Sequence, residues 1–168
     1  AALGSGRCGK GGWVARAPTL SRHRTRVAGR NFGWYSEYPF VPAGVSAAYI
    51  RGVQGQGMAT SGKHCVGNDS EFARMTIASQ IPERAFRELY LVPFASAVEA
   101  GTYTIMPGHN KMYGTWCGAN SLILEDLLRG ERGQARQAVS AWSSLPPTDR
   151  APAPRPPPCP PPPPLPPR

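Results

Sequence analysis

Lysine and histidine stand next to each other in the segment MATSGKHCVGND, residues 58–69, and both side chains can do chemistry. The ammonium of Lys63 donates hydrogen bonds, and a histidine such as His64 can donate, accept or exchange a proton near neutral pH. The pair can also be a polar step from a strand into a loop. Which description applies depends on the elements that position the pair and on the side chains they bring beside it.

The spacing of apolar residues predicts short strands that alternate with helices. The expected elements are strands at 58–62 and 102–106 and helices at 43–56, at 83–98 and from Asn120, as N-cap, to Gly130. Pro93 is expected to kink the second helix or to end its regular part, because proline has no N–H to donate to the preceding turn. This alternation predicts an α/β fold with βαβ units and a parallel sheet.

Each expected strand is followed by a polar segment. KHCVGND follows the first strand, and PGHNK, residues 107–111, follows the second. In a parallel sheet the carboxyl ends of the strands open onto one face, where ligands bind. The topology therefore predicts that four side chains are neighbours: Lys63, His64, His109 and Asn110.

The net charge of +9 sits in the two flanks of the sequence. Residues 1–29 carry six basic side chains and no acidic one, residues 131–168 carry five arginines against Glu131 and Asp149, and residues 30–130 hold eight of each sign. A nucleic-acid-binding face would interleave basic and aromatic residues on the folded part, so no nucleic-acid partner is expected.

No run approaches the ~18 apolar residues of a membrane span and the start lacks a signal-peptide pattern, so a soluble chain without a membrane partner is expected.

The sequence has four cysteines without any CxxC spacing: Cys8, Cys65, Cys117 and Cys159. Cys65 and Cys117 could be combined with His64 and His109 as a zinc set, but the close ligand pairs typical of zinc sites are missing. We therefore expect free, mostly buried thiols, no metal and no cofactor.

Five separated segments occur in the order of a known family: GRNFGWYSEYPF, AAYIRGVQGQG, KHCVGNDSEFARM, ERAFRELYLVPF and HNKMYGTWCGANSLILEDLLRGE. On these motifs, residues 16–131 resemble glycoside hydrolase family 3, the β-glucosidase-type enzymes, in the N-terminal (β/α)8 barrel domain. Such barrels usually need ~250 residues, so the resemblance implies a partial TIM barrel.

The resemblance implies retaining hydrolysis of terminal β-linked sugars, with a carboxylate nucleophile and a carboxylic acid/base about 5 to 5.5 Å apart. A β-linked oligosaccharide or glucoside is the implied partner. It also implies substrate-binding roles for the arginine of GRNF, the Lys-His pair, the arginine of EFARM and the histidine that replaces the family's tyrosine in PGHNK. These are Arg30, Lys63, His64, Arg74 and His109.

The sequence departs from the family after Glu131. The family continues into a strand that ends in Ser-Asp-Trp, whose aspartate is the nucleophile, and it supplies the acid/base from a second domain. Here the sequence reads RGERGQARQAVSAWSSLPPTDR and runs into polyproline, without a Ser-Asp-Trp. The hypothesis at this point is a truncated or frame-shifted gene product, or a mis-assembled gene model, that lacks both catalytic carboxylates and is inactive.

The flanks are expected to lie outside the barrel piece. Residues 1–15 are rich in glycine and basic and predict a disordered or non-native lead, and residues 132–168 predict an extended, disordered tail. An alternative function follows from the tail, since proline-rich segments bind aromatic-lined grooves. In that alternative the chain is a non-catalytic interaction protein.

Overall fold

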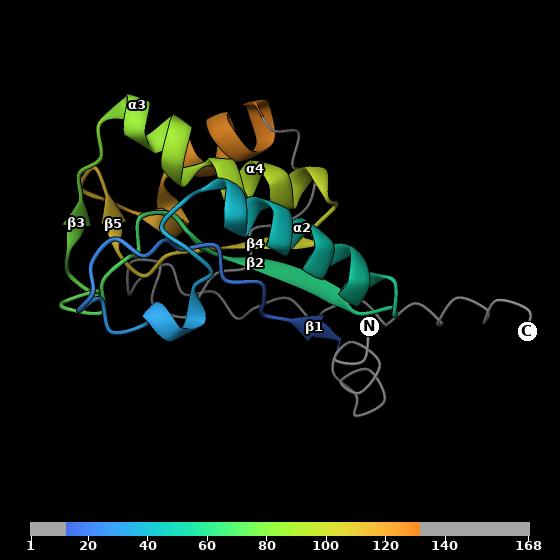
Figure 1. The fold of residues 1–168 in the computed structure, drawn as a ribbon. Helices are drawn as coiled ribbons and strands as arrows, with labels where there is room; N and C mark the ends of the chain where they lie inside the picture. The colour runs from blue at the N-terminus through green and yellow to red at the C-terminus, as the bar shows by residue number, and fades with distance from the viewer. Residues whose placement is uncertain (1–12, 132–168) are drawn as a thin grey trace, which may run out of the picture.

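The computed structural model describes residues 13–131, and the expected lead and proline-rich tail lie almost entirely outside the described residues. Figure 1 shows the element order. The elements are β1 (Val14–Ala15), η1 (Asn31–Gly33), α2 (Phe40–Gln54), β2 (Ala59–Cys65), β3 (Ala78–Ser79), α3 (Glu83–Ala85), η2 (Phe86–Tyr90), α4 (Val92–Glu99), β4 (Thr104–Pro107), β5 (Lys111–Met112), β6 (Thr115–Trp116), η3 (Cys117–Ala119) and η4 (Leu122–Glu131).

A parallel sheet in the order β1-β2-β4 forms the centre of the described part. In this sheet Ser61 pairs with Thr104 and Lys63 with Met106. β2 tolerates small residues because its neighbours approach closely: a Cβ added at Gly62 would lie 3.1 Å from Leu20 Cδ1 and 3.3 Å from Ile105 Cδ1. The α/β fold and the parallel pairing expected from the sequence are confirmed.

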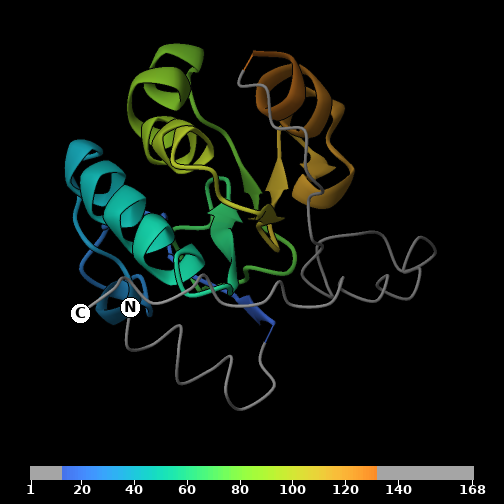
Figure 2. The same cartoon turned by 90° about the vertical axis from the view of Figure 1, so that its right-hand side faces the viewer.

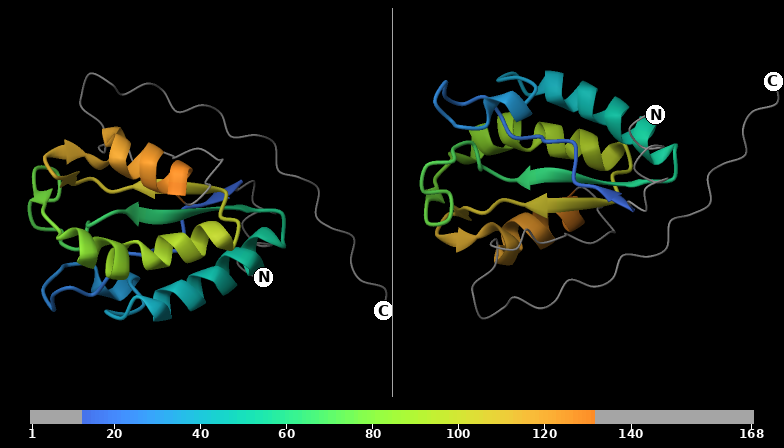
Figure 3. Two further views of the ribbon diagram at one scale, coloured as in Figure 1. Left: turned by 90° about the horizontal axis from the view of Figure 1, so that it is seen from above. Right: turned by 90° about the horizontal axis from the view of Figure 1, so that it is seen from below.

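Helices cover one side of the sheet. Figures 2 and 3 show α2 and α4 side by side against β2. η4 lies next to η2 on the same side, where Glu131 pairs with Arg87 at 2.8 Å. Phe94 and Ala97 of α4 join the main apolar core together with Ile50 of α2 and Ile105 of β4. The helices therefore hold β2 in the middle of the core, which fixes the position of its carboxyl end.

The helix boundaries differ from the expected ones. The first helix begins at Phe40, and Pro42 lies in its first turn, where a missing N–H costs little. The helix expected at 83–98 is interrupted: a π-helical turn precedes α4, and Pro93 lies in the first turn of α4. The regular helix expected over 83–98 is thus broken just before Pro93, which agrees with the expected end of its regular part.

The third helix also differs at its end. Asn120 Oδ1 accepts a hydrogen bond from the Ile123 backbone N–H at 3.4 Å, as expected of an N-cap. The expected stop at Gly130 is wrong, because η4 runs through Glu131, the last described residue, and its hydrogen-bond pattern is that of a π-helix.

A smaller sheet in the order β3-β5-β6 extends the fold beyond β4, with β3 and β5 parallel and β5 and β6 antiparallel.

Cys65 and Cys117 are buried free thiols, as expected, whereas Cys8 and Cys159 lie outside the described residues. Residues 13–131 contain no cluster of three His, Cys, Asp or Glu side chains placed to hold a metal ion. None of the described helices is both long and apolar enough to cross a membrane.

Candidate sugar-binding site

Lys63 and His64 lie inside β2 and not in the loop after it. The expected end of the strand at residue 62 is wrong, because backbone pairing continues on both sides. On one side Lys63 pairs with Met106, and on the other its carbonyl accepts a hydrogen bond from the Leu20 N–H at 2.5 Å. Both residues still lie near the carboxyl end of a central parallel strand, where ligands bind in α/β folds.

His109 lies in the segment after β4 and faces His64. The centroids of the two rings are 6.1 Å apart, at an interplanar angle of 40°. His64 and His109 are therefore neighbours, as expected, although His64 lies in β2 itself. Asn110 lies next to His109 in the segment after β4 but is fully buried. Its amide donates hydrogen bonds to the carbonyls of Val66 and Gly67 at 3.2 and 3.3 Å. Asn110 therefore braces the fold.

Arg30 and Arg74 meet through a shared carboxylate. Glu71 Oε1 lies 3.0 Å from Arg30 Nε, and its Oε2 lies 2.6 Å from Arg74 Nη1. The sequence analysis did not single out Glu71, although its position three residues before Arg74 is the spacing of a local ion pair. Glu71 thus holds both arginines in one place.

The two loops that carry these residues pack closely. The Glu71 N–H donates to the Ala28 carbonyl at 2.9 Å. The adjacent Gly29 has φ +87°, and a Cβ there would lie 3.0 Å from Glu71 Cβ. Only glycine adopts this backbone conformation without strain, so Gly29 permits the contact that aligns the arginines.

Positive charge dominates the cluster formed by Arg30, Lys63, His64, Arg74 and His109, which we call the cationic cluster. Burial, then Lys63, His109, Arg30 and Arg74, lower the pKa of His64 to about 3. Burial and Arg74 lower the pKa of His109, with Glu71 acting in the opposite direction. Both histidines are therefore neutral at pH 7.

Neighbouring positive charges also act on the ammonium of Lys63. Burial, followed by Arg16 and Arg30, lowers the pKa of its ammonium. Within residues 13–131 this half-buried ammonium has no ion-pair or hydrogen-bond partner. The cationic cluster therefore offers unoccupied donors, while its one carboxylate, Glu71, is occupied by two arginines.

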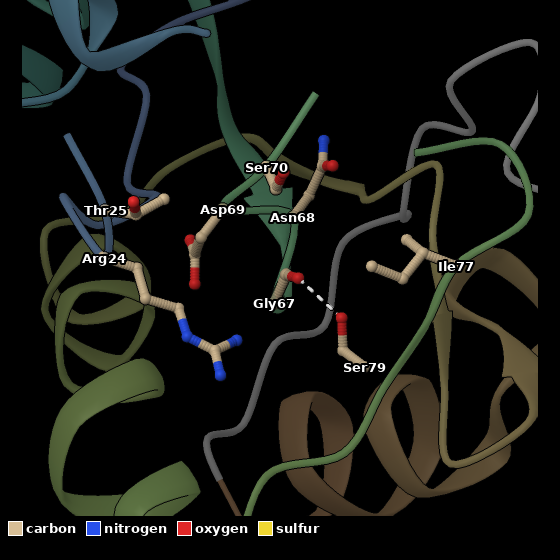
Figure 4. A pocket seen from close by; sticks show the side chains of 8 residues that line it. All are labelled: Arg24, Thr25, Gly67, Asn68, Asp69, Ser70, Ile77 and Ser79. Carbon is tan, nitrogen blue, oxygen red and sulfur yellow. Dashed lines mark hydrogen bonds between the residues drawn. The ribbon is translucent and has the colours of Figure 1, made fainter. Parts of the chain in front are cut away.

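A separate polar hollow of about 250 Å³ lies beside the loop after β2. Figure 4 shows its lining residues, which are Arg24, Thr25, Gly67, Asn68, Asp69, Ser70, Ile77 and Ser79. Burial raises the pKa of Asp69, whereas the Arg22 N–H that it accepts, at 3.2 Å, acts in the opposite direction. None of the five predicted site residues lines this hollow, so the cationic cluster is a distinct place.

The fold and the cluster define an α/β domain with a hydrogen-bond-donating site at the carboxyl ends of parallel strands. Residues 13–145 match the model of the Glycosyl hydrolase family 3 N terminal domain, and the chain belongs to this family. The family resemblance expected from the five sequence motifs is confirmed.

The relatives are β-glucosidases. A beta-glucosidase of Rhizobium radiobacter is 44% identical over 142 residues, which are 84% of this chain and 17% of that protein. Beta-glucosidase B of Emericella nidulans is 42% identical over 134 residues, 79% of this chain and 16% of that protein. The chain thus spans less than a fifth of either relative.

Solved structures agree with this. Beta-glucosidase 3B from Thermotoga neapolitana, determined in complex with glucose, superimposes with a TM-score of 0.82 at 36% identity, over 84% of this chain and 20% of that one. DesR, a beta-glucosidase from Streptomyces venezuelae in complex with D-glucose, gives a TM-score of 0.85 at 28% identity, over 88% of this chain and 19% of that one.

Proposed function

We propose that the chain supplies the sugar-binding part of a retaining β-glucosidase site, built on a partial (β/α)8 barrel. The parallel order β1-β2-β4, with α2 and α4 on one side, supports the barrel assignment. The glucose complexes of two structural neighbours support the sugar as ligand.

The observation that carries the proposal is the cationic cluster itself. A neutral sugar offers hydroxyl groups, which are recognised by convergent charged donors in a partly dry site. Lys63 and the two arginines provide such donors, and Glu71 fixes the arginines before the ligand arrives. The neutral ring of His64 can donate one hydrogen bond and accept another.

Binding and bond cleavage are separate in this chain. Retaining hydrolysis needs a carboxylate nucleophile, and Glu71 is occupied by Arg30 and Arg74. The family match continues past Glu131 to residue 145 and includes Ser140, Ala141 and Trp142. This triplet differs from the family's Ser-Asp-Trp only by alanine in place of the nucleophilic aspartate. The chain therefore binds a glucoside without cleaving it, and this account needs no frame change at Glu131.

Calorimetric titration of the full chain with glucose and with 4-nitrophenyl β-glucoside tests the proposal. We expect binding, at least a tenfold loss of affinity in Lys63→Met, and no release of nitrophenol. Lys111→Met is the matched control, because Lys111 contacts the Trp116 ring in the smaller sheet and lies outside the cationic cluster. Equal affinity in the two variants, or hydrolysis that depends on Lys63, would contradict the proposal.

A further inference from the structure

The polar hollow beside the loop after β2 contains buried oxygen atoms that lack a hydrogen-bond donor. Asn68 and Asp69 line the hollow and are only 4% and 3% exposed. In the described part of the chain, Asn68 Oδ1 and Asp69 Oδ2 have no hydrogen-bond partner. Buried acceptors in folded proteins are nearly always paired with a protein group, a water molecule or a ligand. The hollow therefore calls for an occupant that donates hydrogen bonds.

The floor of the hollow is fixed by hydrogen bonds of its own. Gly67 has φ +75°, and its carbonyl accepts a hydrogen bond from Ser79 Oγ at 2.8 Å, the dashed line in Figure 4. Asp69 Oδ1 accepts the Arg22 N–H at 3.2 Å. Burial raises the pKa of this carboxyl, and the Tyr90 hydroxyl opposes the shift without giving Oδ2 a hydrogen bond. A preformed floor of this kind lowers the entropic cost of binding a ligand.

The charged groups that line the hollow are one carboxyl and one guanidinium. Figure 4 shows the carboxylate of Asp69 and the guanidinium of Arg24 turned toward one another. Arg22 also lies nearby, but its guanidinium donates to the Glu37 carbonyl at 2.9 Å and lies 4.9 Å from the centre of the Tyr90 ring. An anion would meet the carboxylate, and a cation would meet the arginines. The lining therefore favours a neutral ligand.

Hydroxyl groups fit this lining because each can donate one hydrogen bond and accept others. Adjacent hydroxyls of one ligand can donate to the acceptors of the floor, while their oxygens accept from Arg24. Ile77 adds an apolar wall for the C–H groups of such a ligand. The volume of about 250 Å³ is below the 300 to 1,000 Å³ of pockets for larger ligands, so it suits a single small ring.

We propose that the hollow binds a small neutral polyol, as a site separate from the cationic cluster. None of the residues of the cationic cluster lines the hollow. Polyol binding in the hollow is therefore independent of the glucoside binding proposed above.

The test is calorimetric titration of the full chain with myo-inositol at pH 7. We expect binding that Asp69→Asn weakens at least tenfold, because the substitution removes the carboxylate charge and places an amide nitrogen beside the floor. The asparagine oxygen can still accept the Arg22 N–H, so the loop keeps its contact. Asp126→Asn is the matched control, since Asp126 is exposed on η4 and does not line the hollow.

Arg24→Gln is a second variant whose folding is not in question, because Arg24 is exposed at the rim. It should weaken inositol binding at least threefold. Its matched control is Arg26→Gln, because Arg26 is exposed, lies outside the lining and holds Asn31 only through its main-chain carbonyl. Inositol affinity that is unchanged in both Asp69→Asn and Arg24→Gln overturns the proposal.

Backbone-amide NMR separates the hollow from the cationic cluster. Inositol should shift the amide signals of Gly67, Ser70 and Ser79, and these shifts should persist in Lys63→Met. Shifts confined to the ring signals of His64 and His109 would place inositol in the cationic cluster and overturn the proposal, as would the absence of any binding. Shifts at the hollow in a chain that binds no glucoside support the polyol site while the glucoside proposal fails.

Three further probes test the chemical class of the ligand. Methylammonium, acetate and acetamide represent a cation, an anion and a neutral amide. We expect each to shift the amide signals of Gly67 and Ser79 less than inositol does at equal concentration. A charged probe or acetamide that binds in the hollow more tightly than inositol would contradict the assignment to a neutral polyol.

Discussion

Two polar regions lie side by side near the carboxyl ends of β2 and β4, and they are built differently. Around Asn110 the side chain is completely buried, and the two N–H groups of its amide have four acceptors within hydrogen-bond distance of Nδ2, which are Val66 O, Gly67 O, Ser79 Oγ and Lys111 O. In the cationic cluster Lys63 is half-buried and has no such partner within residues 13–131. Satisfied donors hold the fold together, whereas unsatisfied donors are available to a ligand.

The largest effect is expected for Asn110→Ala. The substitution removes the buried amide and its hydrogen bonds to Val66 and Gly67, which leaves these carbonyls only the Cys117 thiol and the Ser79 hydroxyl as donors, and should lower the free energy of unfolding by roughly 3 kcal/mol. Urea denaturation followed by circular dichroism measures this. Gln56→Ala is the control, because that exposed amide contacts only the carbonyl of its neighbour Gly55. A loss below about 0.5 kcal/mol would remove the structural role of Asn110.

Lys63→Met should act in the opposite direction on stability. Removal of a half-buried ammonium without a counter-ion should raise the free energy of unfolding by about 1 kcal/mol. A gain of this size is typical of substitutions that stabilise a protein while removing a functional side chain. The same denaturation experiment measures the gain. If Lys63→Met destabilises the chain as Asn110→Ala does, the two regions do not differ in the way described.

The pH dependence of stability tests the environment of His64. Its pKa lies near 3 in the folded chain and near 6.5 in the unfolded chain, so the unfolded state binds more protons between these values. The contribution of His64 to the free energy of unfolding is therefore fully present above pH 6.5 and is lost as the pH falls toward 3. We expect His64→Gln to flatten this dependence by close to one proton, measured by urea denaturation from pH 4 to 7. An unchanged slope would show that His64 is not held in its neutral form.

The smallest effect is expected for Arg84→Gln. The Arg84–Glu88 ion pair is an exposed i,i+4 contact with 3.0 Å between Nε and Oε1, and such pairs contribute less than about 0.5 kcal/mol. Its denaturation midpoint should match that of the unmodified chain within error. A loss as large as that of Asn110→Ala would mean that exposed charge pairs, and not the buried amide network, hold the described part together.

Local patterns predicted the α/β class, the helix break at Pro93 and the meeting of His64 with His109, because these follow from periodicity, from the missing N–H of proline and from parallel-sheet topology. They did not predict that β2 extends to Cys65. That extension depends on pairing with Leu20 and Met106, which are distant in sequence. Long-range pairing of this kind leaves no trace in the local residue pattern.

The role of Glu71 escaped prediction for a similar reason. Its contact with Arg74 is local, but the one with Arg30 depends on two loops that pack through Ala28 and Gly29. The sequence nonetheless contained the residues for both contacts. A glycine directly before Arg30 and a glutamate three residues before Arg74 are the signals that could have suggested them.

The central claim is that the cationic cluster is the ligand site of this chain. The most direct measurement is a histidine-ring NMR titration of the full chain with a β-glucoside at pH 7. The account predicts saturable shifts of the His64 and His109 ring signals that disappear in Lys63→Met and persist in Lys111→Met. Ring signals of His64 and His109 that stay unchanged while the glucoside binds elsewhere would contradict it.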